Sequence, residues 1–185
     1  MVAALLLVAL VAQAGAYKID PAACEAGFDL KATAHTVHGT TRSGQGEVHV
    51  EPGDVGTLRF SGTISIAAAA LETANDKRDA TMHSKSLLVS TFPTIDFAPE
   101  RFTPSGPPAA DGSVAGILTG RLTIRGQTKP QTIVAQLALE GERIVASGTF
   151  DVVWAEFGIP DPSFFIVRIE KTAHAHFRAE FVPAR

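Results

Sequence analysis

Cysteine is nearly absent from this chain, which has only Cys24 among its 185 residues. No disulfide framework can form within the chain, so the fold has to be stabilised by its core. Along a β-type alternation, Cys24 shares a face with Ala22, Ala26 and Phe28, whereas charged side chains take the other face. We therefore expect a buried, unreactive thiol in place of a redox-active cysteine.

Charged residues are also scarce. They make up 19% of the sequence, and the formal net charge is −3 at pH 7. A nearly neutral chain lacks the basic excess that nucleic-acid binding requires, so no nucleic-acid partner is expected. The length suits one soluble domain with a sizeable core.

Long apolar runs are missing too. Residues 1–12 form an apolar segment that is too short to cross a bilayer, and the small-residue sequence Ala14-Gly15-Ala16 follows it. This pattern is typical of a secretory signal peptide, although no Lys or Arg precedes the apolar run. We expect residues 1–16 to be removed before Tyr17, which leaves one mature domain over 17–185.

The chain contains no familiar catalytic motif: it has no Ser-centred nucleophile elbow, no glycine-rich phosphate loop and no His-Glu metal helix. His174 and His176 alternate on a predicted strand and so face one way, as strand-borne metal ligands would. Their neighbours on that face are Arg178 and Glu180, which favours a solvated outer surface. We expect no cofactor, and whether these two histidines bind a metal stays open.

Short segments of alternating polar and apolar residues fill most of the chain, with turn residues between them. This pattern predicts an antiparallel β-sandwich or β-barrel, and periodicity alone does not separate the two. The clearest segments are 58–66, 118–125, 133–139, 144–154 and 173–181.

Small residues are unusually frequent on the apolar faces of these segments. A closed eight-stranded barrel either fills itself with side chains or holds one ligand, and small inward residues favour the ligand. The alternative is that the glycines mark bulges and barrel corners. The residues concerned include Gly62, Gly120, Ala135, Ala146 and Gly148.

One stretch, residues 71–97, interrupts the β pattern. Thr73, with Asp76 three residues later, resembles a capping box at the start of a helix. The helix has to be short, because Phe92-Pro93 requires extended backbone and residues 94–97 alternate again.

The same stretch contains Asn75-Asp76-Lys77-Arg78-Asp79, Ser84 and Phe92-Pro93-Thr94-Ile95-Asp96-Phe97. With Tyr17-Lys18-Ile19-Asp20-Pro21, the run from Gly120 to Pro130, and Phe157-Gly158-Ile159, these motifs resemble the YceI-like family of polyisoprenoid-binding proteins. The resemblance covers nearly all of the chain after residue 16. It implies a mainly β, lipocalin-like, eight-stranded antiparallel β-barrel with one short helix at its mouth. It also implies a long isoprenoid or similar lipid as ligand, usually in the periplasm. Along the last strand the family is usually acidic, and this chain departs from it with Lys171 and the two histidines.

The first hypothesis is thus a periplasmic lipid carrier with no catalytic residue, which holds an isoprenoid quinone, a polyprenyl lipid or a similar amphiphile. Asn75 and Arg78 are candidate contacts for the ligand head group, although anchoring the helix at the mouth is the favoured role of Arg78. Transient membrane contact and the pairing of two barrels through an open edge stay open. The apolar lining is expected to include Phe28, Phe60, Ile64, Leu87, Phe97, Leu122, Phe150 and Phe165.

The alternative is a barrel enzyme that acts on a small hydrophobic substrate. In it, His35, His38 or Arg78 would transfer protons at the mouth. This hypothesis requires titratable groups that converge in one pocket.

Overall fold

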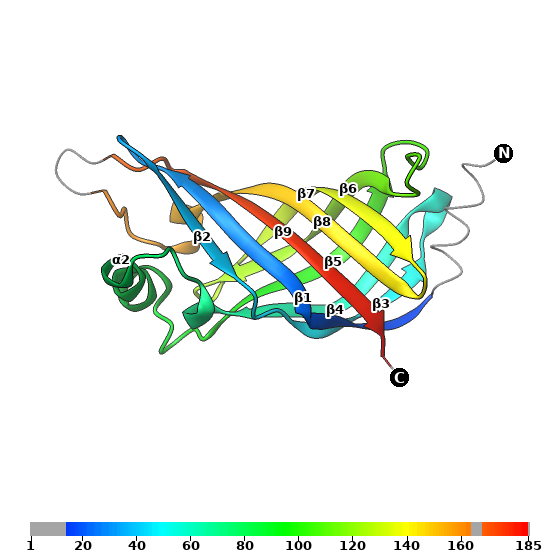
Figure 1. Cartoon of the computed structure of the whole chain (residues 1–185), viewed down its shortest axis with the longest axis horizontal. Coiled ribbons are helices and arrows are strands. Elements are labelled where there is room, and N and C mark those ends of the chain that lie inside the picture. The colour runs from blue at the N-terminus through cyan, green and yellow to red at the C-terminus, as the bar shows by residue number, and fades with distance from the viewer. Residues whose placement is uncertain (1–13, 164–167, 185) are drawn as a thin grey trace.

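The computed structural model describes residues 14–163 and 168–184 and consists mainly of β-strands. These are β1 (Gly15–Lys31), β2 (Thr36–Thr41), β3 (Gln45–Pro52), β4 (Leu58–Ala67), β5 (Thr94–Pro104), β6 (Val114–Ile124), β7 (Gln127–Glu140), β8 (Arg143–Val153) and β9 (Thr172–Pro183). All pairings are antiparallel, in the order β2-β1-β3-β4-β5-β6-β7-β8-β9. Because β1 also pairs with β9, the strands other than β2 close into an eight-stranded barrel (Figure 1). The predicted fold class is confirmed.

The long strand β1 pairs with two different strands along one of its edges. Its first residues pair with β3, and residues 26–31 pair with β2. Within the described part of the chain, β2 meets nothing on its other edge except the bridge between Thr40 and Glu72. At this end of the barrel, the β4–β5 connection, which carries Glu72, therefore continues the wall.

The hairpin connections follow the turn residues in the sequence. Arg125 and Gly126, which join β6 to β7, have φ values of 52° and 70°. Two consecutive residues with positive φ form the turn that matches the twist of a two-residue hairpin. The Pro- and Gly-rich loop after Pro104 joins β5 to β6.

The helical interruption consists of α2 (Asp76–Thr81) followed by one π-helical turn, η3 (Met82–Leu87). The residue that caps α2 is Asn75, whose side-chain oxygen accepts a hydrogen bond from the Arg78 N–H at 3.0 Å. The prediction that Thr73 caps the helix is wrong, because Thr73 lies too far ahead of Asp76. The Thr73 hydroxyl instead donates to the Asp79 carboxylate.

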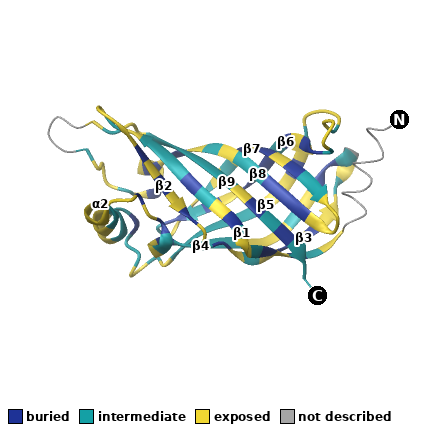
Figure 2. Cartoon of the chain, viewed as in Figure 1, coloured by how far each residue is buried: buried dark blue, intermediate teal, exposed yellow. Residues whose placement is uncertain are grey.

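Two apolar clusters lie inside the barrel, and buried positions occur along its length (Figure 2). We call the cluster away from α2 the closed-end cluster and the one beside α2 the mouth cluster. The closed-end cluster contains the most deeply buried strand residues, such as Phe102 and Leu58, which are 0% and 2% exposed. The mouth cluster lies at the end where α2 is found (Figure 1) and includes Leu71, Leu87 and Leu122. No helix among the described residues is long and apolar enough to cross a membrane.

Candidate functional site: the barrel interior and its mouth

The predicted lining residues lie in the barrel interior, and their contact with a ligand stays a prediction. Apart from Phe165, which lies outside the described residues, each belongs to an apolar cluster or packs against one. Phe97 and Phe150 contact both clusters and so connect the mouth to the closed end. The others divide between the closed-end cluster, which has Phe60 and Ile64, and the mouth cluster, which has Phe28, Leu87 and Leu122.

Fully buried side chains occur in both clusters. The largest include Phe102, Leu58 and Ile133 in the closed-end cluster and Phe157 in the mouth cluster. The inward aromatic residues Phe28 and Phe97, nearer the mouth, are only partly buried. A small barrel can be filled by its own side chains or leave space for one ligand, and we take the partly buried aromatic residues near the mouth as the candidate ligand contacts.

The inward glycines do not leave empty space. A Cβ atom at Gly120 would lie 2.6 Å from Cζ of Phe97 and 2.5 Å from the carbonyl oxygen of Ala98. A Cβ atom at Gly148 would lie 2.9 Å from Cε1 of Phe177. The interpretation that these glycines widen a cavity is wrong, because aromatic rings of neighbouring strands already occupy the space above them.

The mouth carries a compact polar network centred on Thr73, which is 5% exposed. Its N–H donates to the Asp79 carboxylate at 2.9 Å, and its hydroxyl donates to the same oxygen. Arg78 donates from Nε to the Thr73 hydroxyl at 2.7 Å and from a second guanidinium nitrogen to the Thr73 carbonyl. These hydrogen bonds from Thr73, first that of its hydroxyl, hold the pKa of Asp79 below its usual value.

The two candidate head-group residues thus already have structural roles, with Asn75 at the helix cap and Arg78 bound to Thr73. Anchoring is what the sequence favoured for Arg78. A contact with a ligand head group stays a prediction for both side chains.

Several residues of the mouth cluster were not predicted as lining. Met82 and Val89 come from the helical connection, and Phe157 and Ile159 follow β8 in and after the short helix η4 (Trp154–Phe157). The Phe157-Gly158-Ile159 motif was a signal, but irregular backbone has no period from which the inward face could be read.

The proton-transfer groups of the enzyme alternative do not converge. His38 points outward, with Nδ1 2.5 Å from Oδ1 of Asp29, and His35 is exposed in the turn after β1. Arg78 is bound to Thr73. These three side chains do not form one pocket.

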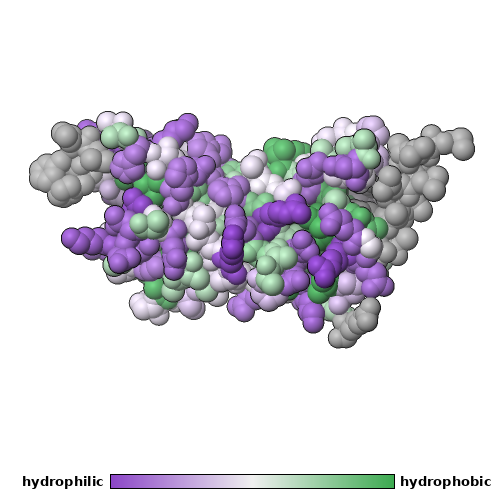
Figure 3. Space-filling view, viewed as in Figure 1, coloured by the Kyte–Doolittle hydropathy of each residue, from purple (hydrophilic) through white to green (hydrophobic). Residues whose placement is uncertain are grey.

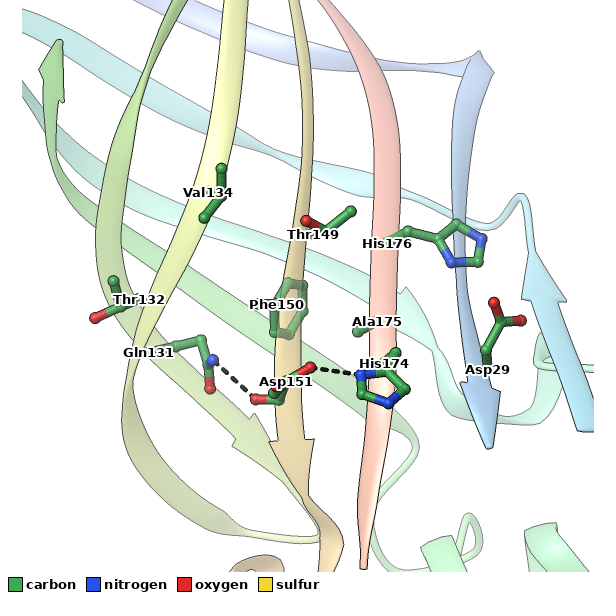
Figure 4. Close-up of a pocket in the computed structure, with 10 residues that line it drawn as sticks. All are labelled: Asp29, Gln131, Thr132, Val134, Thr149, Phe150, Asp151, His174, Ala175 and His176. Carbon is green, nitrogen blue, oxygen red and sulfur yellow. Dashed lines mark hydrogen bonds and ion pairs between the residues drawn. The ribbon is translucent and has the colours of Figure 1, made fainter. Parts of the chain in front are cut away.

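A hollow of about 540 Å³ lies on the outer face of the barrel, over β7, β8, β9 and β1 (Figure 4). Strand register places His38, Asp29, His174 and Asp151 in one row across β2, β1, β9 and β8. His174 Nδ1 lies 2.7 Å from Asp151 Oδ1, and His174 Nε2 lies 3.8 Å from Glu170 Oε2. The outward orientation predicted for His174 and His176 is confirmed.

The histidines His49 and His83 lie elsewhere. His83 Nε2 is 2.8 Å from the Leu71 carbonyl at the mouth, and His49 is near Glu47. Among the described His, Cys, Asp and Glu side chains, no group of three or more is arranged to hold a metal ion.

Cys24 is buried in the closed-end cluster, as predicted. Burial is the main reason why the pKa of its thiol is raised above the ordinary value, which keeps it in the unreactive form. On the face seen in Figure 3, hydrophilic and hydrophobic residues are intermixed at the surface.

Comparison with solved structures shows the same fold in bacterial proteins of low sequence identity. A polyisoprenoid-binding domain from Saccharophagus degradans, implicated in plant cell wall breakdown, superposes with a TM-score of 0.71 at 12% identity, over 91% of this chain and 98% of that one. BcnA from Burkholderia cenocepacia superposes with a TM-score of 0.68 at 17% identity, over 88% of this chain and 98% of that one. The Campylobacter jejuni YceI protein gives 0.60 at 17% identity, over 80% and 85%.

No curated protein matches the sequence significantly. The model of the YceI-like domain, however, matches residues 17–181, which is nearly the whole barrel from β1 to β9. Because this match covers nearly the whole chain, and because the fold is a closed barrel with one short helix, the chain belongs to the YceI-like family.

Proposed function

We propose that this protein is a lipid carrier, exported to the periplasm, which holds the hydrocarbon tail of an isoprenoid quinone, a polyprenyl lipid or a similar amphiphile inside the barrel. The observation that carries the proposal is the set of inward aromatic side chains Phe28, Phe97 and Phe150, which stay partly exposed near the mouth. A protein domain from Saccharophagus degradans with the same fold is a polyisoprenoid-binding domain, which supports an isoprenoid as the ligand.

The size of the hydrophobic contribution favours a long tail. Each buried CH₂ group contributes about 0.8 kcal/mol, while association costs roughly 4–15 kcal/mol before any net affinity appears. A tail that buries about 15 such groups gains on the order of 12 kcal/mol. Short apolar ligands would therefore bind weakly, and a head group at the mouth has to find polar partners such as Asn75 or Arg78.

The proposal includes no reaction, because the titratable side chains at the mouth do not converge on a substrate position. Contact with a membrane would be transient and would serve loading and release of the lipid.

The decisive experiment starts from protein exported by its native host. Organic extraction and mass spectrometry should recover a long-chain lipid, and native mass spectrometry should show it bound to the intact barrel. Purified protein should also bind menaquinone-4, seen as quenching of Trp154, the single tryptophan. If only lipid-free protein is found and menaquinone-4 does not bind, the carrier proposal is wrong.

A matched pair of variants locates the site. Ala175 lies on the inner wall between Phe28 and Phe150, its partners on the two adjacent strands. We expect Ala175→Leu to weaken menaquinone-4 binding at least tenfold, because the larger side chain takes the place of the tail. Ala115→Leu, on the exposed face of β6, should bind like the unmodified protein. Equal binding by both variants would place the ligand elsewhere.

A further inference from the structure

The β4–β5 connection forms a flap over the mouth, which we define as residues 74–92. Its base is fixed to the barrel at both ends. Ala67 pairs with Thr94, the Ala68 N–H donates to the Pro93 carbonyl at 2.9 Å, and Glu72 forms two backbone hydrogen bonds with Thr40, each of 2.9 Å. The chain therefore leaves the wall and returns to it at nearly the same place.

The polar groups of the flap bond within it or to the residues just before it. Arg78 and Asp79 bond to Thr73, and His83 Nε2 lies 2.8 Å from the Leu71 carbonyl. The Val89 N–H donates to the backbone carbonyl of His83, and the Phe92 N–H donates to the backbone carbonyl of Leu88. In the described part of the chain, no hydrogen bond or ion pair joins residues 74–92 to a barrel strand.

Apolar contacts hold the flap on the barrel strands, in addition to its hydrogen bonds to Leu71 and Thr73 at the base. Leu87 is 7% exposed and belongs to the mouth cluster, against which Met82 and Val89 also pack. The Phe92 ring lies over Gly126 in the β6–β7 turn, where a Cβ atom would be 2.7 Å from Cε1 of the ring. Such contacts are not directional, so a hydrocarbon tail can replace them without leaving a buried polar group unpaired.

Both ends of the helical part of the flap have unusual backbone. Ala74 and Leu88 have φ values of 58° and 53°, a left-handed conformation that costs energy in residues with a side chain. These two positions enclose α2 and η3, and a change of φ and ψ there would move the helical part as one body. This motion also breaks the hydrogen bonds of Arg78 and Asp79 to Thr73.

We propose that the flap is the gate of the barrel: it swings about its fixed base without unfolding, and the ligand's hydrocarbon tail enters beneath it and takes over the contacts of Leu87 and Met82. This proposal rests on the carrier function for its ligand. The opening itself belongs to the protein and occurs without ligand.

The test of the opening is hydrogen–deuterium exchange of the ligand-free protein, read by mass spectrometry. Amides of residues 76–92 should exchange at least tenfold faster than those of β6, β7 and β8. Leu87→Ala should accelerate exchange of the flap at least tenfold further and leave the strands unchanged. Leu118→Ala is the matched control, because Leu118 is equally buried at 7% but lies in the closed-end cluster. It should accelerate the strands and not the flap selectively.

Leu87→Met, which keeps the side-chain volume, should restore slow exchange and so exclude misfolding as the cause. Exchange of the flap at the rate of the strands, or equal effects of Leu87→Ala and Leu118→Ala, would overturn the gate.

Stopped-flow quenching of Trp154 fluorescence by menaquinone-4 tests whether the ligand enters the barrel beneath the flap. Association should be at least tenfold faster with Leu87→Ala than with Leu118→Ala or the unmodified protein. If menaquinone-4 binds but all proteins associate equally fast, entry does not pass under the flap and the gate is overturned. If menaquinone-4 does not bind at all, the carrier function fails, whereas the exchange data still show whether the flap opens.

Discussion

Gly120 shows how one residue can be misread from sequence. On an alternating strand it is a small inward residue, which suggests free space, but the ring of Phe97 lies where its side chain would be. An aromatic ring packed over a glycine of the neighbouring strand covers exposed backbone and adds apolar contact. The glycine thus belongs to the packing of the barrel wall.

We predict that Gly120→Ala lowers the free energy of unfolding by about 1–3 kcal/mol, because the added methyl group overpacks the core against Phe97 and Ala98. Chemical denaturation measures the loss. Gly106→Ala is the control, since a Cβ atom at Gly106 would meet nothing within 4 Å, and it should change stability by less than about 0.5 kcal/mol. A stable Gly120→Ala protein that no longer binds lipid would restore the cavity interpretation.

At the scale of structural elements, the stability of the flap depends on the carboxylate of Asp79. Asp79 accepts hydrogen bonds from the Thr73 N–H and hydroxyl, which lower its pKa, and the positive charges of His83 and Arg78 lower it further. A carboxylate with a lowered folded-state pKa contributes stability above its usual pKa of 3.8, and this contribution is lost as pH falls through the folded value.

We therefore expect the flap to lose its protection from hydrogen exchange as pH falls below the ordinary carboxyl pKa of 3.8, before the barrel strands lose theirs. Exchange rates, corrected for intrinsic pH dependence, measure this. Asp79→Asn should remove most of the pH dependence in the flap. Asp111→Asn is the matched control, because the Ser113 hydroxyl and N–H lower the pKa of Asp111 in the same way in the distant β5–β6 loop. If Asp111→Asn abolishes the dependence as well, the Thr73–Asp79 network is not its origin.

For the molecule as a whole, the expected processing site affects how the barrel begins. Gly15 and Ala16 pair with Val50 and His49 of β3, and the Ala184 N–H donates to the Ala16 carbonyl at 2.8 Å. Tyr17, which would become the first residue, is 3% exposed and pairs with both Val48 and Pro183. Cleavage before Tyr17 thus removes two outer pairs and leaves the buried part of β1 in place.

We predict that protein exported by its native host begins at Tyr17, which intact-mass measurement decides. A chain that starts at Tyr17 should also refold with a thermal midpoint within a few degrees of the longer form, because the core residues of β1 are kept. Exported protein that still contains residues 1–16 would contradict the signal-peptide interpretation.

The sequence by itself determined the faces of the strands. Alternation of side chains is a local property, because successive residues of any strand point to opposite sides. It therefore sufficed to place Phe28, Phe97 and Phe150 inside, to bury Cys24, and to turn His174 outward. The turn residues likewise marked the connections between strands, and the family motifs identified the barrel.

Only the tertiary structure decided what depends on partners distant in sequence. Closure through β1 and β9, the row from His38 to Asp151 on the outer face, and the ring over Gly120 all follow from strand register. Register is set by pairing between segments that may be more than a hundred residues apart, and no local pattern contains it. The same holds for Thr73: its sequence position suggests a helix cap, but its contacts with Arg78 and Asp79 exist only once the flap has folded back on itself.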